Sequence, residues 1–101
     1  MIDFLIDECR QDGGDQFVSG MLCAGTIVLG TEFVLASDTP TDSNEPDKEP
    51  RPVKLLVRGI MAYDHQLQEL PQGMSGELLV EGEGAEAIRK GVFLRAHAGS
   101  G

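Results

Sequence analysis

The protein has 101 residues, of which 25% are charged and 41% hydrophobic, a size that fits one compact domain and leaves little room for a second. Lys and Arg total 8 against 17 Asp and Glu, which gives a formal net charge of −9. Because DNA, RNA and anionic membranes attract basic proteins, this charge argues against DNA or a membrane as partner and disfavours general RNA binding. No apolar run approaches the roughly 20 residues of a membrane-spanning helix.

The N-terminal residues and the cysteines indicate the compartment. Residues 1–7 lack the basic start of a signal peptide, so we expect a cytoplasmic protein. Cys9 and Cys23 are then expected as two reduced thiols, with a single disulfide as the alternative. Neither belongs to a CxxC pair, and His65 and His97 complete no metal-ligand spacing. The sequence therefore predicts no metal and no other cofactor.

The first part of the chain alternates apolar runs with glycine turns. We expect a strand over 1–8, ended by the turn chemistry of 12–15, and a second strand over 17–24 that bends at Gly20. A short connection over 25–30 leads to an apolar strand over 32–36.

The composition changes abruptly over 37–52, which holds four of the five prolines, several acidic residues and no large apolar side chain. This predicts a mobile, solvated loop. The alternative is an acidic docking segment for a basic partner.

The last part of the chain again consists of short apolar runs between turns. The expected elements are a strand over 53–62, a polar connection over 63–68, a turn over 70–73, a strand over 76–81, a flexible turn over 82–84, a helical turn over 85–90 capped by Gly91, a strand over 92–96 and a frayed tail over 97–101.

Six or seven short strands and one helical turn predict an all-β fold, a small closed antiparallel β-barrel that spans 1–101 as a single domain. The side chains expected to fill its interior are Ile27, Val28, Phe33, Leu35, Leu56, Ile60, Leu79 and Phe93.

One ordered set of residues is more specific than composition. Phe4-Leu5-Ile6 opens it, three glycines follow at intervals of five, and VKLLVRGI, LPQGMSGELLVEG and IRKGVFL come later in the chain. This order resembles the second domain of the translational GTPases, the β-barrel of elongation factor Tu and its relatives. The glycines that match the family's corners are Gly20, Gly25, Gly30, Gly59, Gly73, Gly76 and Gly91.

The resemblance implies a barrel that, in the family, packs on a GTPase domain, contacts the small ribosomal subunit and helps hold the aminoacylated end of transfer RNA. This chain contains no GxxxxGK[ST] phosphate loop, so it is not itself the GTPase. Met21 and Ala24 stand where the family usually has basic residues, and Met61 stands where elongation factor Tu has a carboxylate. The family's aromatic residue is retained as Tyr63.

The candidate binding residues are Met61, Tyr63, Asp64 and His65, which combine a stacking ring, a carboxylate and an imidazole. A solvated connection between two strands is the alternative interpretation of the same residues. Ser75, His65 and Asp64 are the residue types of a catalytic triad, but the sequence has no GxSxG elbow around the serine. We therefore predict no catalytic residues and no enzyme.

We therefore expect a non-catalytic, stand-alone translation-factor-like barrel that acts as an interaction module for a protein partner. One alternative is a ribosome- or tRNA-associated barrel that uses Arg51, Lys54 and Arg58. The other is a small-ligand-binding barrel. A monomer is expected, with pairing through a rim of Met21, Leu22 and Met61 as the alternative.

Overall fold

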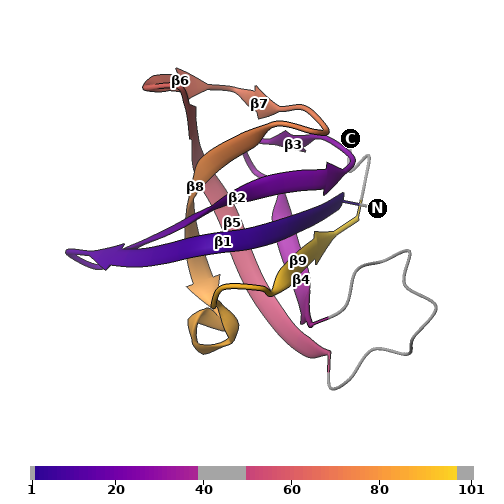
Figure 1. The fold of residues 1–101 in the computed structure, drawn as a ribbon. Coiled ribbons are helices and arrows are strands. Elements are labelled where there is room, and N and C mark those ends of the chain that lie inside the picture. Colours follow the sequence, from indigo (N-terminus) through magenta and orange to yellow (C-terminus); the bar gives the residue numbers. More distant parts are fainter. Residues whose placement is uncertain (1, 39–49, 98–101) are drawn as a thin grey trace.

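The computed structural model describes residues 2–38 and 50–97, which form strands and one short helical turn (Figure 1). The strands are β1 (Ile2–Asp12), β2 (Asp15–Ala24), β3 (Ile27–Val28), β4 (Glu32–Ser37), β5 (Arg51–Ala62), β6 (His65–Leu67), β7 (Glu69–Leu70), β8 (Ser75–Glu83) and β9 (Phe93–Ala96). The helical turn, η1 (Ala85–Ala87), is a 3-10 helix between β8 and β9.

Six of the strands close into a barrel. They lie in the order β4–β9–β1–β2–β8–β5, and β5 pairs back onto β4. Each neighbouring pair is antiparallel, and closure removes most of the unpaired strand edges that an open sheet would expose. β6 is an additional strand on the end of β5. The predicted all-β, closed antiparallel barrel is confirmed.

Short elements that the sequence did not predict cover one end of the barrel. The segment expected as a polar connection over 63–68 contains β6, and β7 follows it and pairs with β3 in a separate two-stranded sheet (Figure 1). Strands of two or three residues are held by pairing with distant partners, so local periodicity does not reveal them. The helical turn expected over 85–90 is also shorter than predicted, because it ends at Ala87.

Aliphatic side chains and two phenylalanines fill the interior. The largest fully buried side chains are Phe4, Ile6, Val18, Leu22, Ile27, Phe33, Leu55, Val57, Ile60, Leu70, Leu78 and Leu94. The rings of Phe4 and Phe33 pack with their centroids 6.4 Å apart, within the range of favourable aromatic pairs. The predicted interior positions of Ile27, Phe33 and Ile60 are confirmed.

The other predicted interior residues lie elsewhere. Val28 is exposed, and the half-buried ones are Leu35, Leu56, Leu79 and Phe93. In β5 the cause is a β-bulge at Arg58, where two residues of β5 advance against one of β8. Leu56 and Ile60 would share a face in a regular strand, but the bulge shifts the alternation by one residue. Ile60 therefore points inward and Leu56 does not.

Gly20 marks a tight approach of β2 to β1. A Cβ atom at this position would overlap the carbonyl oxygen of Leu5. Beside it β1 carries a bulge, because Ile6 pairs with Gly20 while Glu8 pairs with Ser19. Glycine is required here for space, which allows the two strands to bend together.

The remaining glycines of the family-like set occupy two kinds of position. Those with positive φ are Gly25, Gly30, Gly73 and Gly91, and those inside strands are Gly59 and Gly76.

Among the ion pairs of the described residues, one is buried. Asp3 on β1 and Arg95 on β9 are cross-strand partners, their side chains are 4% and 6% exposed, and Nε of Arg95 lies 3.7 Å from Oδ1 of Asp3. Removing one partner of such a pair leaves an uncompensated buried charge, which costs about 3–5 kcal/mol. Replacement of either residue alone is therefore expected to weaken the pairing of β1 with β9.

The loop predicted over 37–52 and the tail predicted over 97–101 fall largely outside the described residues. β4 ends at Ser37 and β5 begins at Arg51. An ion pair of 3.7 Å between Asp38 and Arg51 connects the end of β4 to the start of β5.

Two further observations concern the whole described part of the chain. Cys9 and Cys23 are not joined in a disulfide. Among the described residues, no helix has the length and apolar character needed to cross a membrane.

Candidate functional site

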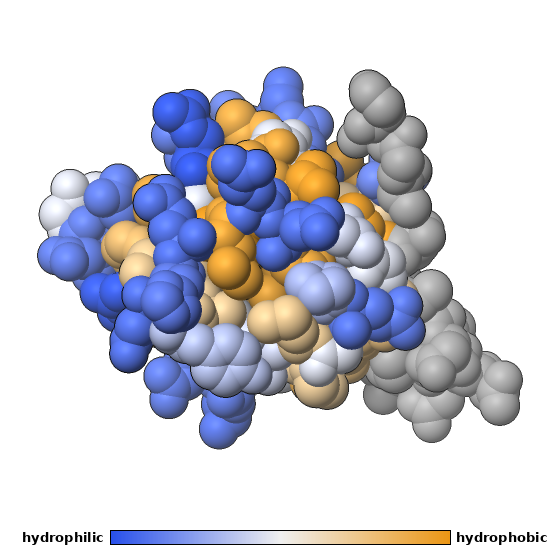
Figure 2. Space-filling view, turned by 90° about the horizontal axis from the view of Figure 1, so that it is seen from above, coloured by the Kyte–Doolittle hydropathy of each residue, from blue (hydrophilic) through white to orange (hydrophobic). Residues whose placement is uncertain are grey.

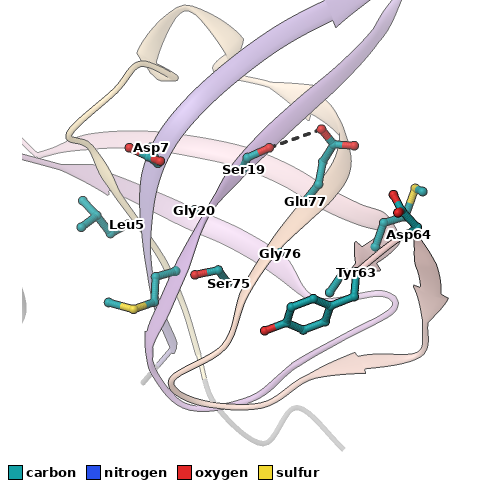
Figure 3. Close-up of a pocket in the computed structure, with 12 residues that line it drawn as sticks. Leu5, Asp7, Ser19, Gly20, Tyr63, Asp64, Ser75, Gly76 and Glu77 are labelled. Carbon is teal, nitrogen blue, oxygen red and sulfur yellow. Dashed lines mark hydrogen bonds between the residues drawn. The ribbon is translucent and has the colours of Figure 1, made fainter.

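A hollow of about 510 Å³ opens on the outer face of the barrel (Figure 3). It extends across β1, β2 and β8 to the turn between β5 and β6. Met21, Met61 and Tyr63 are exposed and line it, and its charged residues are Asp7, Asp64 and Glu77.

The register of the sheet brings these side chains together in rows. Met21 on β2 lies opposite Ser75 on β8. In the next row Glu77 of β8 lies between Ser19 of β2 and Met61 of β5. Directly opposed side chains in antiparallel strands are about 5 Å apart. The hollow is therefore assembled from segments that are distant in the sequence.

Tyr63 and Asp64 form a two-residue turn that overhangs one end of the hollow. Ala62 pairs with His65, and φ is 53° at Tyr63 and 62° at Asp64. Such hairpin turns favour Asn, Asp and Gly, and the left-handed conformation costs other residues roughly 1–2 kcal/mol. The Tyr63 side chain is 79% exposed, so packing does not compensate for this cost. Fold stability alone does not explain a tyrosine at this position.

Asp7 lies at the other end of the hollow. It is the extra residue of the bulge in β1, since its neighbours pair with Gly20 and Ser19 and Asp7 itself has no cross-strand partner. A bulge re-aims a side chain relative to a regular strand. Figure 3 shows Asp7 near Leu5, across the hollow from Tyr63 and Asp64.

The electrostatic character of the hollow is negative. Glu77 accepts a hydrogen bond of 3.3 Å from the Ser19 hydroxyl and pairs with Arg10 at 3.3 Å. Asp7 and Asp64 make no ion pair within residues 2–38 and 50–97. Over the same ranges no Lys, Arg or His lines the hollow. The carboxylates of Asp7 and Asp64 are therefore exposed there, with no cation beside them among the residues that the structure describes.

The structure brings together three of the four predicted binding residues. Met61, Tyr63 and Asp64 line the hollow, whereas His65 is exposed and is not part of its lining. Ser75 also lines it, but among the described residues no hydrogen bond joins Ser75 to His65 or Asp64. Within the described ranges, these three residues are therefore not hydrogen-bonded as a catalytic triad.

No group of three His, Cys, Asp or Glu side chains in the described part of the chain is arranged to hold a metal ion.

Sequence reasoning missed Asp7, Ser19 and Glu77. The alternation of apolar and polar residues places Ser19 and Glu77 on the outer faces of their strands. It does not show that the two strands are neighbours. Asp7 gave no signal, because a bulge depends on how β1 pairs with β2.

The basic residues of β5, which an RNA-associated barrel would use, lie against acidic ones. Nη1 of Arg58 is 2.8 Å from Oε1 of Glu81. Lys54 lies opposite Glu83 on β8, and Arg51 is paired at the start of the strand. These cations do not form an isolated basic stripe.

One of the three residues expected to form a rim for self-association is not on the surface. Met21 and Met61 are each 43% exposed, but Leu22 is fully buried in the core. Along β2 successive side chains alternate, so Met21 and Leu22 face opposite sides of the sheet.

A second apolar area lies at the end of the barrel covered by β3, β6 and β7. Val28 and Leu29 are 44% and 45% exposed there, and Leu67 lies beside them. Figure 2, which views the molecule from this end, shows apolar side chains in the middle of the face with hydrophilic ones around them.

Comparison with known proteins supports the fold. The structure is similar to translation elongation factor SelB from Methanococcus maripaludis in its apo form, with a TM-score of 0.68, 19% sequence identity and 92% of this chain covered. The barrel has a translation-factor fold. The resemblance to an elongation factor Tu domain 2-like barrel is confirmed at this level.

The translation-factor-like barrel spans 18% of the length of that elongation factor. No protein-family model and no curated protein sequence matches the chain.

Proposed function

We propose that this translation-factor-like barrel is a non-catalytic interaction module that binds a protein partner through the hollow at Met21, Met61 and Tyr63. The observation that carries the proposal is Tyr63, an exposed ring held in a left-handed turn that favours other residues. Strained residues that the fold does not need are concentrated at binding sites. Exposed aromatic and methionine side chains are also typical of protein contacts.

The partner is expected to be a protein rather than RNA because of the charges. Nucleic acid binding draws much of its affinity from Lys and Arg side chains on phosphates. The hollow has carboxylates in their place, and the net charge of the chain is −9. The protein is further proposed to be cytoplasmic and monomeric. As a monomer, it should elute as a single species of monomer size in gel filtration.

The test is affinity capture from a cell lysate with matched variants. We expect a set of captured proteins that Tyr63→Ala loses and that Gln72→Ala, an exposed position outside the hollow, retains. Capture should survive nuclease treatment. If Tyr63→Ala captures the same proteins as wild type, the hollow is not the binding surface.

A ribosome- or tRNA-associated barrel is the second candidate, favoured by the similarity to a translation elongation factor. Its signature would be co-sedimentation with ribosomes or transfer RNA that strengthens steeply as salt is lowered. No binding of either at low salt would remove it.

A small-ligand barrel is favoured only by the volume of the hollow, about 510 Å³, which lies within the range of roughly 300–1,000 Å³ for ligand pockets. It predicts a ligand that changes the melting temperature of wild type and not of Tyr63→Ala.

A further inference from the structure

The hollow has a carboxylate at each end, and between them lie apolar side chains and a third carboxylate. Asp7 of β1 lies at one end, and Asp64 of the β5–β6 turn lies at the other (Figure 3). Neither carboxylate has an ion-pair partner among the described residues. Glu77, between them, is already engaged by Ser19 and Arg10. The two ends are therefore the places where a cation from outside would be bound.

The centre of the hollow is suited to an apolar side chain. Met21 and Met61 are each 43% exposed, and methionine adapts its shape to different apolar partners. Tyr63, whose side chain is exposed, precedes Asp64 in the turn, and both residues line this end of the hollow. An aromatic face next to a carboxylate attracts a Lys or Arg side chain through both the ring and the charge.

The spacing of the two carboxylates sets the shape of the occupant. Asp7 is on β1 and Asp64 is in the turn that follows β5, and the strands β1, β2, β8 and β5 are neighbours in that order. Three strand spacings of about 4.8 Å put β5 roughly 14 Å from β1 across the sheet. An extended peptide rises about 3.3 Å per residue, so residues four apart span a similar distance and point to the same side.

From this geometry we propose that the hollow recognises an extended basic–apolar–basic segment of a partner protein. A Lys or Arg contacts Asp7, a large aliphatic residue two positions along packs between Met21 and Met61, and a second Lys or Arg four positions along contacts Asp64 and Tyr63. The inference rests on the proposed protein-binding function and specifies its partner.

The test uses a defined peptide, GSKSLSKSG, which has two lysines four positions apart and a leucine midway. It is titrated into ¹⁵N-labelled full-length protein while amide chemical shifts are recorded. We expect saturable shifts centred on residues 5–7, 19–21, 61–64 and 75–77. Two comparison peptides, GSKSSSKSG and GSESLSESG, remove the apolar residue or reverse the charges, and both should bind at least about fivefold more weakly.

The variants test each end of the hollow separately. Asp7→Asn and Asp64→Asn should each weaken GSKSLSKSG about two- to fivefold, and Asn remains compatible with the left-handed turn at position 64. Glu86→Gln removes an exposed carboxylate on η1, outside the hollow, and should leave the affinity unchanged. Raising the salt concentration should weaken binding, because exposed charges are screened.

The inference is overturned if the three peptides bind alike, if Glu86→Gln weakens binding as much as Asp7→Asn, or if no shifts appear in the hollow at millimolar peptide. Failure of the proposed function looks different, because lysate capture would then not depend on Tyr63. Capture that depends on Tyr63 but is unaffected by Asp7→Asn and Asp64→Asn would preserve the protein-binding function and reject the basic segment.

Discussion

Two hairpin turns of this barrel each have two consecutive residues with positive φ, but they use different residue types. In the β1–β2 hairpin, Gly13 and Gly14 have φ of 58° and 97°. In the β5–β6 hairpin, Tyr63 and Asp64 have φ of 53° and 62°. The first turn has the residues that this conformation favours. The second places a bulky, exposed ring in a left-handed conformation, which is the observation behind the binding role that we propose for Tyr63.

The surroundings of the two turns support this distinction. A Cβ atom at Gly13 or Gly14 would meet no other atom within 4 Å, so conformation alone accounts for glycine in that turn. The β1–β2 hairpin tip projects from the barrel (Figure 1). The Tyr63 turn instead forms one wall of the hollow. Both turns reverse the chain through two residues of positive φ, but only the second lines the hollow.

The largest effect on stability is expected from substitution of Gly20, where a side chain has no space and no turn is involved. The added Cβ of Gly20→Ala would overlap the Leu5 carbonyl oxygen, and we expect a loss of about 3 kcal/mol in the free energy of unfolding. The control is Gly30→Ala, whose φ is 92° but whose Cβ would be unhindered, with an expected loss of about 1 kcal/mol. Urea unfolding measures both, and equal losses would show that β1 and β2 do not approach closely.

A smaller effect is expected when the Tyr63–Asp64 pair is transplanted into the glycine turn. The double variant Gly13→Tyr, Gly14→Asp places side chains in positive-φ positions without creating a clash. It should lower the free energy of unfolding by about 1–2 kcal/mol. An unchanged denaturation midpoint would mean that a tyrosine is tolerated in this conformation at no cost. Tyr63 would then need no explanation beyond the fold.

The reverse exchange should stabilise the protein. Tyr63→Asn with Asp64→Gly gives the β5–β6 turn the Asn-Gly pair that two-residue hairpins favour. We expect a gain of about 1 kcal/mol, which corresponds to a rise of about 4–8 °C in melting temperature for a domain of this size. Differential scanning calorimetry measures it, and a fall in melting temperature would show that the Tyr63 side chain contributes to stability.

Sequence patterns predicted much of the barrel. Apolar runs separated by glycine turns located the six barrel strands, and the glycine spacing indicated the translation-factor fold. The inward-facing residues were predicted less well, because a bulge such as that at Arg58 reverses the alternation beyond it. Bulges depend on the pairing of two strands, and the sequence of one strand does not show them.

The lining of the hollow could be predicted from the sequence only where its residues are close together. Met61, Tyr63 and Asp64 are such residues, because they surround one turn. Asp7 and Glu77 were not found, because the sheet register brings them there from β1 and β8. To predict a surface that is built from several strands, the order of the strands in the sheet must be known. The composition of the chain does not give that order.

The most direct test of the hollow as a binding surface uses Tyr63 itself. The chain has one tyrosine and no tryptophan, so its intrinsic fluorescence reports on this position alone. Acrylamide quenching is measured with and without saturating GSKSLSKSG, a peptide that does not fluoresce. We expect efficient quenching of the free protein, because the side chain is 79% exposed, and clear protection in the presence of the peptide. Equal quenching in both samples, while the peptide is bound, would contradict binding at the hollow.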